Sequence, residues 1–489
     1  MKERAVCVVV PAYNNAGTVV DVARSALEWC DDVIVVNDGS TDDTAQRLAD
    51  VPQVVVITYE RNRGKGYALR KAFLSARSQG FAYAVTIDAD GQFYAKDIPA
   101  MLAANIEHPG ALIVGRRRFG NAKRTKGSRF ANRFSDFWFR LQTGRRLDDT
   151  QSGFRLYPLR RLSGLRLMPP RYEGELAMLV FASWHGTDIV TTDVDVYYPP
   201  AEERVSHFRP TADFARISVL NTVLCLLAVV YGAPLRLLRF CGKWLRTGYA
   251  AAFFAFFALV IFAPYVWLLT HIGAMNERKR RHLHQLIHAA SRFVMMRHGV
   301  PGTRFGYKVA PETRFDKPRV IICNHQSHLD IMCQMVFSPD IIFLTNSWAW
   351  NNPFYGLLIR NAEFLSVRDG IDALIPQLRS LVERGYSIAV YPEGTRSSDG
   401  TIQRFHRGAF YIARQLNLEV LPMYLYGTGR VLKKKSRHLN KSRIYIEVDR
   451  PLTQEEMQRI GDTRAQAAAM HRRYEEKYAE IANIMDRDA

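Results

Sequence analysis

The chain has 489 residues, of which 67 are Lys or Arg and 47 are Asp or Glu, giving a formal net charge of +20. At roughly 100–200 residues per domain, this length predicts two or three domains that each bury a core. With 48% hydrophobic and 23% charged residues, the composition excludes a disordered chain and a transporter with many membrane spans, and the positive excess favours an anionic partner such as a phosphorylated substrate, lipid headgroups or nucleic acid.

The first third of the chain alternates short apolar runs with helix-like stretches. This order is typical of β-α-β units with a parallel sheet that is buried on both faces. Ligands of such sheets bind beyond the carboxyl ends of the strands. The expected strands are Val6–Val10, Val33–Val36, Val54–Thr58, Tyr83–Ile87 and Leu112–Val114. The expected helices are Thr18–Trp29, Asp42–Ala49 and Tyr67–Ser78.

The middle of the chain is apolar. Ile217–Leu235 and Thr247–Asn276 contain no Asp, Glu, Lys or Arg. About 20 apolar residues span a bilayer, so the second stretch predicts membrane contact, whereas the first also suits a buried core helix. Positive charge marks the cytoplasmic side, and here it flanks both stretches, while Pro264 permits a kink. We therefore expect one-leaflet or re-entrant insertion, with basic side chains on anionic headgroups. The flanking residues are Arg236, Arg239, Lys243, Arg246, Arg278, Lys279, Arg280 and Arg281.

The α/β alternation resumes near Gly302, and the tail from Gln454 is expected to be helical. The fold class is therefore α/β, with two α/β domains at residues 1–210 and 301–489. A hydrophobic, membrane-associated helical segment at residues 211–300 joins them. The expected strands of the second domain are Val320–Cys323, Ile341–Thr345, Ser387–Tyr391, Val420–Tyr424 and Ile444–Val448.

Two carboxylates, Asp88 and Asp90, follow the expected strand Tyr83–Ile87. Carboxylates two residues apart at a strand end can hold a hard divalent cation, which in turn grips a diphosphate. The Asp-x-Asp pattern alone is weak, because Asp193-Val-Asp195 repeats it in what we interpret as a surface strand. The position of the first pair at the strand-end rim favours a functional role.

Other polar groups share this rim. Asp38 follows a second strand, and Lys65 lies between two glycines where a helix opens. Helix N-termini attract phosphate, although a plain turn is the alternative for this segment. Arg116-Arg-Arg118 and Asp148–Arg155 add guanidinium and carboxylate groups, which could clamp a phosphate or form a solvated basic loop.

Together these segments resemble the family-2 glycosyltransferases, specifically the branch similar to dolichyl-phosphate-mannose synthase. The resemblance covers about residues 4–210 and implies a glycosyltransferase A-type fold that binds a nucleotide-sugar donor. The Gln-x-x-Arg-Trp motif of processive members is missing, so polymerisation is not expected. The matching segments are Val10-Pro-Ala-Tyr-Asn14, Val36-Asn-Asp-Gly-Ser-Thr-Asp42, Asn62-Arg-Gly-Lys-Gly66, Asp88-Ala-Asp-Gly-Gln92 and Gln151-Ser-Gly-Phe-Arg155.

The resemblance also implies roles for single residues. Asp90 with Gln92 would ligand Mg²⁺ or Mn²⁺, and Asp38 would lie near the nucleoside. Asp149 is the candidate base for the acceptor, and a phosphate acceptor would need no strong base. The acceptor is expected to be lipid-linked. The expected substrate- or phosphate-binding residues are Pro11, Asp38, Lys65, Asp88 and Arg155.

A second cluster, Asn324-His-Gln-Ser-His-Leu-Asp330, follows the expected strand Val320–Cys323. On a regular helix a spacing of five separates His325 from Asp330, so they meet only if His325 lies at the helix mouth. The carboxylate could then orient an imidazole that takes a proton from a hydroxyl. His328 is a competing base, and a metal site built from these three residues is a further alternative.

The segment Tyr391-Pro-Glu-Gly-Thr-Arg-Ser397 follows another expected strand. Gly394 lets the backbone approach a ligand, Arg396 can fork a phosphate, and Glu393 can orient either group. Arg368 offers a further guanidinium.

These segments resemble the glycerolipid, or lysophosphatidic acid, acyltransferase family over about residues 285–460. The family implies a thioester donor, either acyl carrier protein or coenzyme A. His325 would be the base and Asp330 its partner, while Glu393, Gly394, Arg396 and Arg368 would bind substrate. The matching segments are Asn324–Asp330, Phe364-x-x-x-Arg368, Pro392–Ser397 and Val420-Leu-Pro422, with Tyr391 where Phe is commoner. Two preceding stretches, Tyr249–Leu269 and Arg278–Val294, match that family's membrane-docking helices.

The two resemblances predict a bifunctional, membrane-bound transferase in glycolipid biosynthesis. One part would transfer a sugar to a lipid-linked acceptor, and the other would acylate a hydroxyl, a layout that resembles fusions of bacterial aryl-polyene lipid pathways. Fusion on one membrane raises the effective concentration of a shared intermediate. The alternative is that only the acyltransferase is active, on a lysophospholipid such as 1-acylglycerol-3-phosphate. No zinc-finger spacing or aromatic RNA-recognition motif is visible, so nucleic acid is not an expected partner.

The cysteines and the start of the sequence bear on location. None of the six cysteines forms a Cys-x-x-Cys pair, which argues against a disulfide scaffold and a structural zinc site. The first four residues lead directly into an apolar run, without the pattern of a signal peptide. We expect the protein to lie at the bacterial inner membrane, with both catalytic domains facing the cytoplasm.

Overall fold

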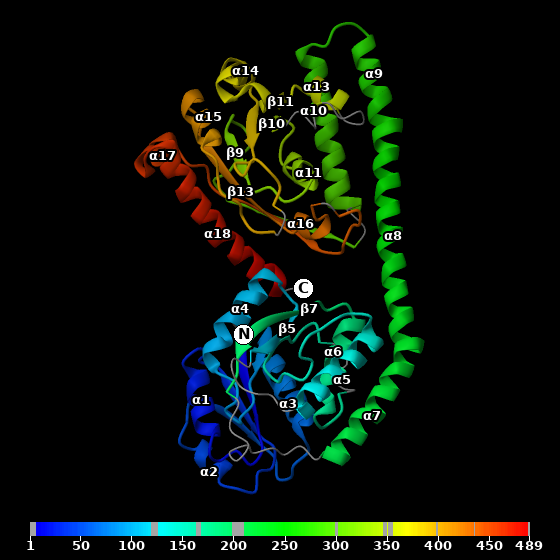
Figure 1. The fold of residues 1–489 in the computed structure, drawn as a ribbon. Coiled ribbons are helices and arrows are strands. Elements are labelled where there is room, and N and C mark those ends of the chain that lie inside the picture. The colour runs from blue at the N-terminus through cyan, green and yellow to red at the C-terminus, as the bar shows by residue number, and fades with distance from the viewer. Residues whose placement is uncertain are drawn as a thin grey trace. The chain divides into compact units, whose positions relative to one another are not determined.

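The computed structural model describes residues 6–118, 126–162, 168–197, 210–298, 302–345, 350, 356–397, 400–434 and 436–487. The chain divides into two compact units, residues 1–239 and 240–489 (Figure 1). Each unit contains one seven-stranded sheet with helices on it, which confirms the predicted α/β fold class. The finer limits at residues 210 and 300 stay a prediction.

The first unit is built on a sheet in the order β3-β2-β1-β4-β6-β5-β7. β6 runs antiparallel to both of its neighbours, and the remaining pairs are parallel. The strands are β1 Val6–Ala12, β2 Val33–Asn37, β3 Val55–Thr58, β4 Tyr83–Thr86, β5 Leu112–Arg118, β6 Arg155–Pro158 and β7 Ile189–Asp195. All five predicted strands of this part are present, and β6 and β7 are additional.

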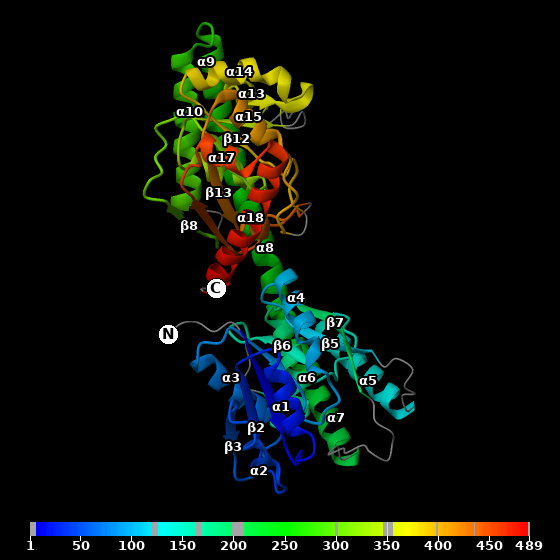
Figure 2. The same cartoon turned by 90° about the vertical axis from the view of Figure 1, so that its left-hand side faces the viewer.

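Helices cover both faces of this sheet. Cys7 and Val9 on β1 pack into one core, and Val8 and Val10 pack into the other, because side chains alternate along a strand. The first core is closed by α3 Lys65–Ser78, α6 Glu173–Trp184 and α7 Pro210–Leu227. The second is closed by α1 Val19–Leu27, α2 Thr44–Leu48 and α4 Ile98–Glu107 (Figure 2). α5 Lys126–Thr143 packs on α6.

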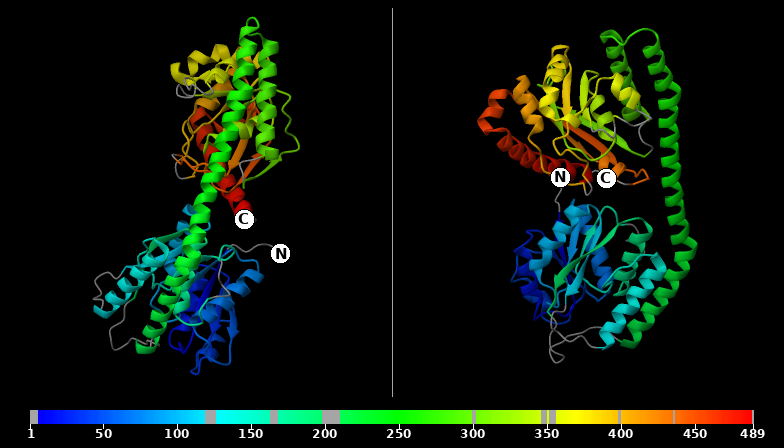
Figure 3. Two further views of the ribbon diagram at one scale, coloured as in Figure 1. Left: turned by 90° about the vertical axis from the view of Figure 1, so that its right-hand side faces the viewer. Right: turned by 45° about the horizontal axis from the view of Figure 1, so that its top comes forward.

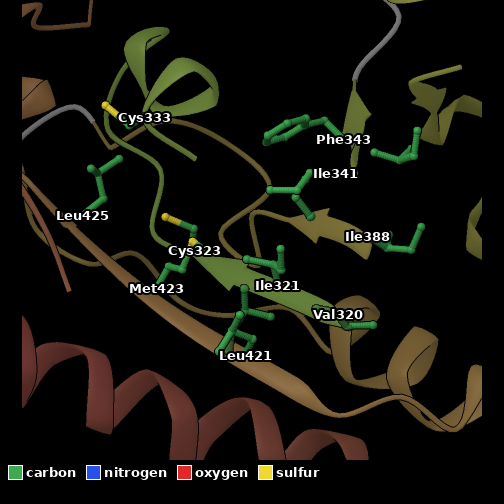
Figure 4. Close-up of a cluster of buried hydrophobic side chains, with 14 of the residues drawn as sticks. Val320, Ile321, Cys323, Cys333, Ile341, Phe343, Ile388, Leu421, Met423 and Leu425 are labelled. Atoms are coloured by element: carbon green, nitrogen blue, oxygen red, sulfur yellow. The ribbon is translucent and has the colours of Figure 1, made fainter. Parts of the chain in front are cut away.

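The second unit has the sheet order β11-β10-β12-β9-β13-β14-β8, in which only the β13–β14 pair is antiparallel. Apolar side chains of β9, β10, β12 and β13 meet in its core (Figure 4). The strands are β8 Arg304–Val309, β9 Val320–Cys323, β10 Ile341–Thr345, β11 Leu365–Ser366, β12 Ser387–Val390, β13 Val420–Tyr426 and β14 Arg443–Val448. The helices are α10 Glu277–Arg292, α11 Leu329–Met335, α13 Gly356–Asn361, α14 Ile371–Glu383, α15 Gly408–Leu416, α16 Thr428–Val431, α17 Gln454–Ile460 and α18 Thr463–Arg487.

The apolar middle of the chain is helical without a break from Pro210 to His271 (Figures 1 and 3). It comprises α7, α8 Ala233–Phe256 and α9 Ala263–His271, with the π-helical turns Ala228–Gly232 and Phe257–Phe262 between them. Pro264 lies in the first turn of α9 and does not end the helix, and the expected one-leaflet or re-entrant insertion stays a prediction. The wider π-helical turn before Pro264 makes room for the proline ring, and the missing N–H falls at the first positions of α9.

One helix of the described chain, Phe214–Leu269, is long and apolar enough to cross a membrane, and only 6% of its most apolar window is buried. After α9 the chain turns into α10, which lies beside α9 (Figures 1 and 3). The Lys279 ammonium on α10 donates to the carbonyls of Leu269 and Gly273, both at 3.0 Å. This contact caps the C-terminus of α9 with a positive charge, where the helix dipole favours one.

Candidate active sites

The first candidate site lies where the parallel strands β1, β2, β3 and β4 end. Pro11 is the buried penultimate residue of β1, and Asp38 directly follows β2. Lys65 begins α3 after β3, and Asp88 follows β4 by two residues. Because parallel neighbours end at one edge of a sheet, these segments, which are distant in sequence, share one rim.

At this rim Lys65 is held between two carboxylates. Its Nζ lies 2.6 Å from Asp88 Oδ1 and 2.9 Å from Glu175 Oε2, and its side chain is only 14% exposed. Burial lowers the pKa of the Lys65 ammonium, but the two carboxylates outweigh burial and hold it above its ordinary value. The Lys65 ammonium is thus already paired with protein carboxylates, and its expected contact with a phosphate stays a prediction. Glu175 lies 110 residues further along the chain and belongs to no recognised motif, so no signal in the sequence indicated that it pairs with Lys65.

Asp90 is a second carboxylate of this rim, and it is a weaker acid than a free aspartic acid side chain. Burial and the neighbouring Asp88 carboxylate raise the pKa of Asp90 to about 6. Its Oδ1 accepts a hydrogen bond of 3.0 Å from the backbone N–H of Gln92, which fixes the turn. Such a carboxylate ionises more readily when a cation binds beside it, and carboxylate and amide oxygens are ligands for a hard divalent ion. Asp90, with the Gln92 side chain, therefore fits such an ion.

The protein alone supplies few ligands to a metal. Among the described residues, no group of three or more His, Cys, Asp or Glu side chains is arranged to hold a metal ion. A cation at Asp90 would take its remaining ligands from a bound diphosphate and from water, as Mg²⁺ commonly does.

Asp38 organises the start of α3. Its carboxylate accepts hydrogen bonds from the backbone N–H groups of Arg63 (3.0 Å) and Gly64 (2.6 Å). Burial raises the pKa of Asp38, although these two N–H groups act in the opposite direction. Gly64 has φ +96°, and a side chain there would meet the carbonyl oxygen of Pro170 at 2.6 Å. The sequence Asn62–Gly66 is thus a tight turn fixed by Asp38.

Gly153 makes room for the Lys65–Asp88 ion pair. A Cβ atom at this position would lie 2.4 Å from Asp88 Oδ2 and 2.8 Å from Lys65 Nζ. The carbonyl of Gly153 accepts a hydrogen bond of 2.7 Å from the Thr86 hydroxyl, which fixes it against β4. The Gln151–Arg155 segment therefore forms one wall of the first site.

We expect Gly153→Ala to lower sugar transfer by roughly tenfold and to cost about 1–3 kcal/mol of stability, because the added methyl group overpacks a buried ion pair. Nucleotide-sugar turnover and the thermal unfolding midpoint measure the two effects. Gly17→Ala is the control, since nothing lies within 4 Å of a Cβ there. Equal behaviour of the two variants would contradict this account of the wall.

Two predicted residues near this wall have other contacts. The Asp149 carboxylate is 4% exposed and is bound on both oxygens by Arg117, whose Nη2 is 2.6 Å from Oδ1 and whose Nε is 2.9 Å from Oδ2. A carboxylate clamped in this way does not fit the expected base. Arg155 is 1% exposed and donates to the carbonyls of Ser152, Glu175 and Thr150 and to the Tyr157 hydroxyl. It braces the fold through these contacts, and the expected roles of Asp149 and Arg155 stay predictions that this geometry does not favour.

The other arginines of the expected clamp are also paired. Arg116 Nη2 and Arg118 Nη2 lie 2.6 and 2.7 Å from the carboxylate of Asp193, one strand away on β7. Asp193-Val-Asp195 is therefore part of a surface strand, as we interpreted it.

The second candidate site lies at the ends of β9 and β12, which are adjacent and parallel. His325 Nδ1 is 2.8 Å from Asp330 Oδ2, with His325 before α11 and Asp330 in its first turn. His325 and Asp330, five residues apart, therefore meet in the way that the sequence predicted, with the histidine at the mouth of the helix. Since a carboxylate can only accept, Nδ1 carries the proton and Nε2 keeps the free lone pair.

The Asp330 carboxylate is itself fixed. Its side chain is fully buried, and Oδ2 also accepts from the N–H groups of Gln326 (2.7 Å) and Ser327 (2.8 Å). Oδ1 is buried without a hydrogen-bond partner. The Tyr391 ring stacks on the His325 ring with centroids 4.0 Å apart, so the imidazole has one orientation.

Glu393 joins the two halves of the second site. Its Oε1 accepts a hydrogen bond of 2.7 Å from the N–H of His325, and its Oε2 accepts one of 2.9 Å from the N–H of Gln403. Glu393 is 3% exposed, so it positions the backbone and does not face a substrate. Gly394 follows with φ +67° and is exposed.

The remaining predicted residues lie at the same rim. Arg396 is partly exposed, and its carbonyl accepts from Lys434 Nζ at 2.6 Å. Partial burial and the nearby charge of Arg396 lower the pKa of His328. Arg368 is exposed after β11, which is parallel to β10 in the same sheet.

Asn324 has a role that the sequence did not reveal. Its side chain donates to the carbonyl of Leu425 (2.7 Å) and accepts from the N–H of Leu425 (2.8 Å). It thus continues the β9–β13 ladder by one step after β9 has ended, which fixes the backbone directly before His325.

Two family models match this chain: glycosyl transferase family 2 at residues 7–160 and acyltransferase at residues 306–426. The chloroplastic 1-acyl-sn-glycerol-3-phosphate acyltransferase LPAT1 of Arabidopsis thaliana is 29% identical over 143 residues, which are 28% of this chain and 40% of that protein. A UDP-N-acetylglucosamine–dolichyl-phosphate N-acetylglucosaminyltransferase of Methanococcus voltae is 27% identical over 222 residues, 40% of this chain and 88% of that protein.

Among solved structures, the 1-acyl-sn-glycerophosphate acyltransferase PlsC of Thermotoga maritima covers 48% of this chain and 96% of its own, at 19% identity and a TM-score of 0.41. The chain thus spans less than half the length of the plant acyltransferase that it matches, and nearly nine tenths of the archaeal glycosyltransferase.

Proposed function

From a chain that joins a glycosyl transferase family 2 domain to an acyltransferase domain, we propose a bifunctional, membrane-bound enzyme of glycolipid biosynthesis. It transfers a sugar from a nucleotide-sugar to a lipid-linked acceptor, and it acylates a hydroxyl from a thioester donor. The observation that carries the proposal is that each unit holds its own polar cluster at a strand-end rim. These are Asp88 and Asp90 with Lys65 in the first unit, and His325 with Asp330 in the second.

In the first unit, Asp90 and Gln92 would hold Mg²⁺ or Mn²⁺, and Lys65 fixes the adjacent Asp88 through an ion pair. When bound, the cation neutralises the charge that develops on the leaving diphosphate. Asp38 would lie near the nucleoside, at the turn that opens α3. Because Asp149 is clamped by Arg117, a phosphate acceptor, which needs no strong base, is favoured over a sugar hydroxyl.

In the second unit, His325 Nε2 would take the proton of the acceptor hydroxyl as its oxygen attacks the thioester carbonyl. Asp330 stabilises the imidazolium that forms, and Tyr391 holds the ring in line. The imidazolium then returns the proton to the leaving thiolate. Arg396 and Arg368 would bind the phosphate of the acceptor or donor.

Exposed apolar side chains support the lipid acceptor and the membrane. α5 exposes Phe130, Phe137 and Leu141 by 65%, 58% and 57%, in the same unit as the glycosyltransferase rim. The long helix exposes a larger set, and exposed apolar patches of this size mark membrane or partner contacts. We place the enzyme at the bacterial inner membrane, with both domains facing the cytoplasm. The exposed residues of α8, of the π-helical turn Phe257–Phe262 and of α9 include Trp244, Leu245, Tyr249, Phe254, Phe256, Leu259, Val260, Trp267 and Leu268.

A second candidate function is acyl transfer alone, to a lysophospholipid such as 1-acylglycerol-3-phosphate. The name of the plant relative, a 1-acyl-sn-glycerol-3-phosphate acyltransferase, favours it. In that case the first unit would be catalytically silent.

The test is to incubate the purified full-length protein in lipid vesicles with nucleotide-sugars, lipid phosphates and acyl thioesters, and to follow products by mass spectrometry. We expect both consumption of a nucleotide-sugar and acylation of a lipid product. Acylation of 1-acylglycerol-3-phosphate without turnover of any nucleotide-sugar would leave only the second candidate.

A further inference from the structure

A basic pocket of about 640 Å³ lies in the second unit, outside the residues already described. Its walls are the segment 404–407 before α15 and the first turns of α18, the long C-terminal helix that also packs on β13 (Figure 2). No Asp or Glu lines it. The charged and titratable residues of the lining are Arg404, His406, Arg407, Arg464, His471 and Arg472.

The guanidinium groups of this pocket have no close ion-pair partner in the described part of the chain. Elsewhere in the unit arginines are paired, for example Arg319 with Glu419 at 2.8 Å and Arg473 with Asp449 at 2.6 Å. The four arginines of the pocket make no side-chain hydrogen bond or ion pair with any residue in the described part of the chain. Four such groups around one concavity form a strong site for an anion with several charges.

The nearest acidic groups are already used by the local backbone and by histidine. The Asp462 carboxylate accepts from the N–H groups of Arg464 (3.0 Å) and Ala465 (2.8 Å) at the start of α18. Glu475 Oε2 lies 3.4 Å from His471 Nδ1, one turn further along α18. Neither lines the pocket. The N–H group of Ala465 and, less strongly, the charges of Arg464 and Arg407 lower the pKa of Asp462, so that carboxylate partly balances these two arginines.

One wall of the pocket is tied to the acyltransferase rim. The N–H of His406 donates to the carbonyl of Pro392 at 2.8 Å, and a Cβ on Gly394 would lie 3.4 Å from the His406 ring. The N–H of Gln403 donates to Glu393, which in turn accepts from the N–H of His325. A ligand in the pocket would thus contact the segment that positions the catalytic histidine.

We propose that this pocket binds the 3′-phosphoadenosine diphosphate part of an acyl-coenzyme A donor. The inference rests on the proposed acyl transfer and deepens it by naming the donor. The volume falls in the range of small-molecule sites, about 300–1,000 Å³. The three phosphates of the nucleotide match several guanidinium forks, and the adenine ring can stack on a guanidinium or imidazole plane. The pantetheine arm would join the nucleotide in the pocket to a thioester at His325, whose N–H shares the Glu393 carboxylate with the N–H of Gln403, the residue before Arg404.

A small molecule suits the pocket better than the acidic surface of acyl carrier protein. A folded protein buries a broad patch of about 800 Å² per partner and inserts few groups into a concavity. Here the unpaired arginines surround a hollow, and two of its walls come from separate segments of the chain.

The test uses the full-length protein in vesicles, with Arg404→Ala/Arg472→Ala as the variant. The charge-matched control is Arg304→Ala/Arg314→Ala, which removes two exposed arginines on β8 and in the segment after it. Adenosine 3′,5′-bisphosphate is the probe for direct binding by calorimetry. We expect it to bind the wild type and to inhibit acyl transfer from acyl-coenzyme A competitively, but not transfer from the N-acetylcysteamine thioester, which lacks a nucleotide. The double variant should raise the KM for acyl-coenzyme A and the Kd of the probe by at least about tenfold, because each lost charged hydrogen bond costs that order.

An unchanged KM and Kd in the double variant would overturn the inference. So would a loss confined to acyl carrier protein as donor with no binding of the nucleotide probe. If the wild type transfers no acyl group from any thioester, the proposed function fails, and binding of the probe then decides separately whether the pocket is a nucleotide site.

Discussion

His325→Ala is expected to lower acyl transfer by roughly a thousandfold or more while sugar transfer continues at the wild-type rate. The imidazole is the only titratable group held in one orientation by a carboxylate at the described rim of the second unit, with Nδ1 2.8 Å from Asp330 Oδ2. General base catalysis and charge stabilisation by such a pair together contribute about 10²–10⁴ in rate. The check is to measure acyl transfer from a labelled thioester and turnover of nucleotide-sugar on the same preparation of the variant.

Loss of folding does not account for such an effect, because Asp330 keeps two backbone donors, Gln326 and Ser327, after the imidazole is removed. Asp330→Asn should reduce the rate by about a hundredfold or more, since the amide can no longer hold Nδ1 protonated. The matched control is His328→Ala, three residues further on. If His328→Ala abolishes acyl transfer and His325→Ala does not, the roles of the two histidines are exchanged.

The sheets were predictable where a strand is a continuous apolar run. Buried parallel strands such as β1 and β9 have this pattern, and their ends identify the rim on which both sites lie. β6 was missed because it begins with Arg155, a charged residue whose burial depends on partners in another segment. β8 was missed because it is an edge strand with exposed polar residues, and β11 because it has two residues.

Motifs predicted which side chains reach each rim but not which of them are already bound by the protein. Lys65 and Arg155 both come close to the first site, yet Lys65 pairs with Glu175, and Arg155 donates its hydrogen bonds to backbone carbonyls and to Tyr157. These partners are set by three-dimensional packing, and no local spacing encodes them. The His325–Asp330 contact was predictable because both residues lie in one short segment with a single geometry that joins them.

The long helix is another feature that the sequence predicted only in part. Its apolar content was evident, but its continuity through Pro264 depends on the π-helical turn Phe257–Phe262, which composition does not reveal. The charged stretch between the two apolar runs, which includes Arg236, is part of the same helix.

Asp90→Asn is expected to lower sugar transfer by at least about a hundredfold and to leave acyl transfer unchanged. The amide keeps the acceptor for the N–H of Gln92, now 3.0 Å away, but removes the negative charge that would bind the divalent cation. Because burial and Asp88 raise the pKa of Asp90 to about 6, its ionised form is disfavoured in the fold. A neutral amide removes this cost, so the thermal unfolding midpoint should not fall.

Asp193→Asn is the matched control, because it alters the other Asp-x-Asp of the same unit, where the carboxylate pairs with Arg116 and Arg118 on the surface. Surface ion pairs contribute at most about 1 kcal/mol, so this variant should retain sugar transfer. Turnover measured with Mg²⁺, with Mn²⁺ and after chelation separates the two positions, since only the wild type and Asp193→Asn should regain activity when metal is returned. Equal turnover by Asp90→Asn and the wild type would show that Asp90 does not bind the cation. The leaving diphosphate could then no longer be assigned to this rim.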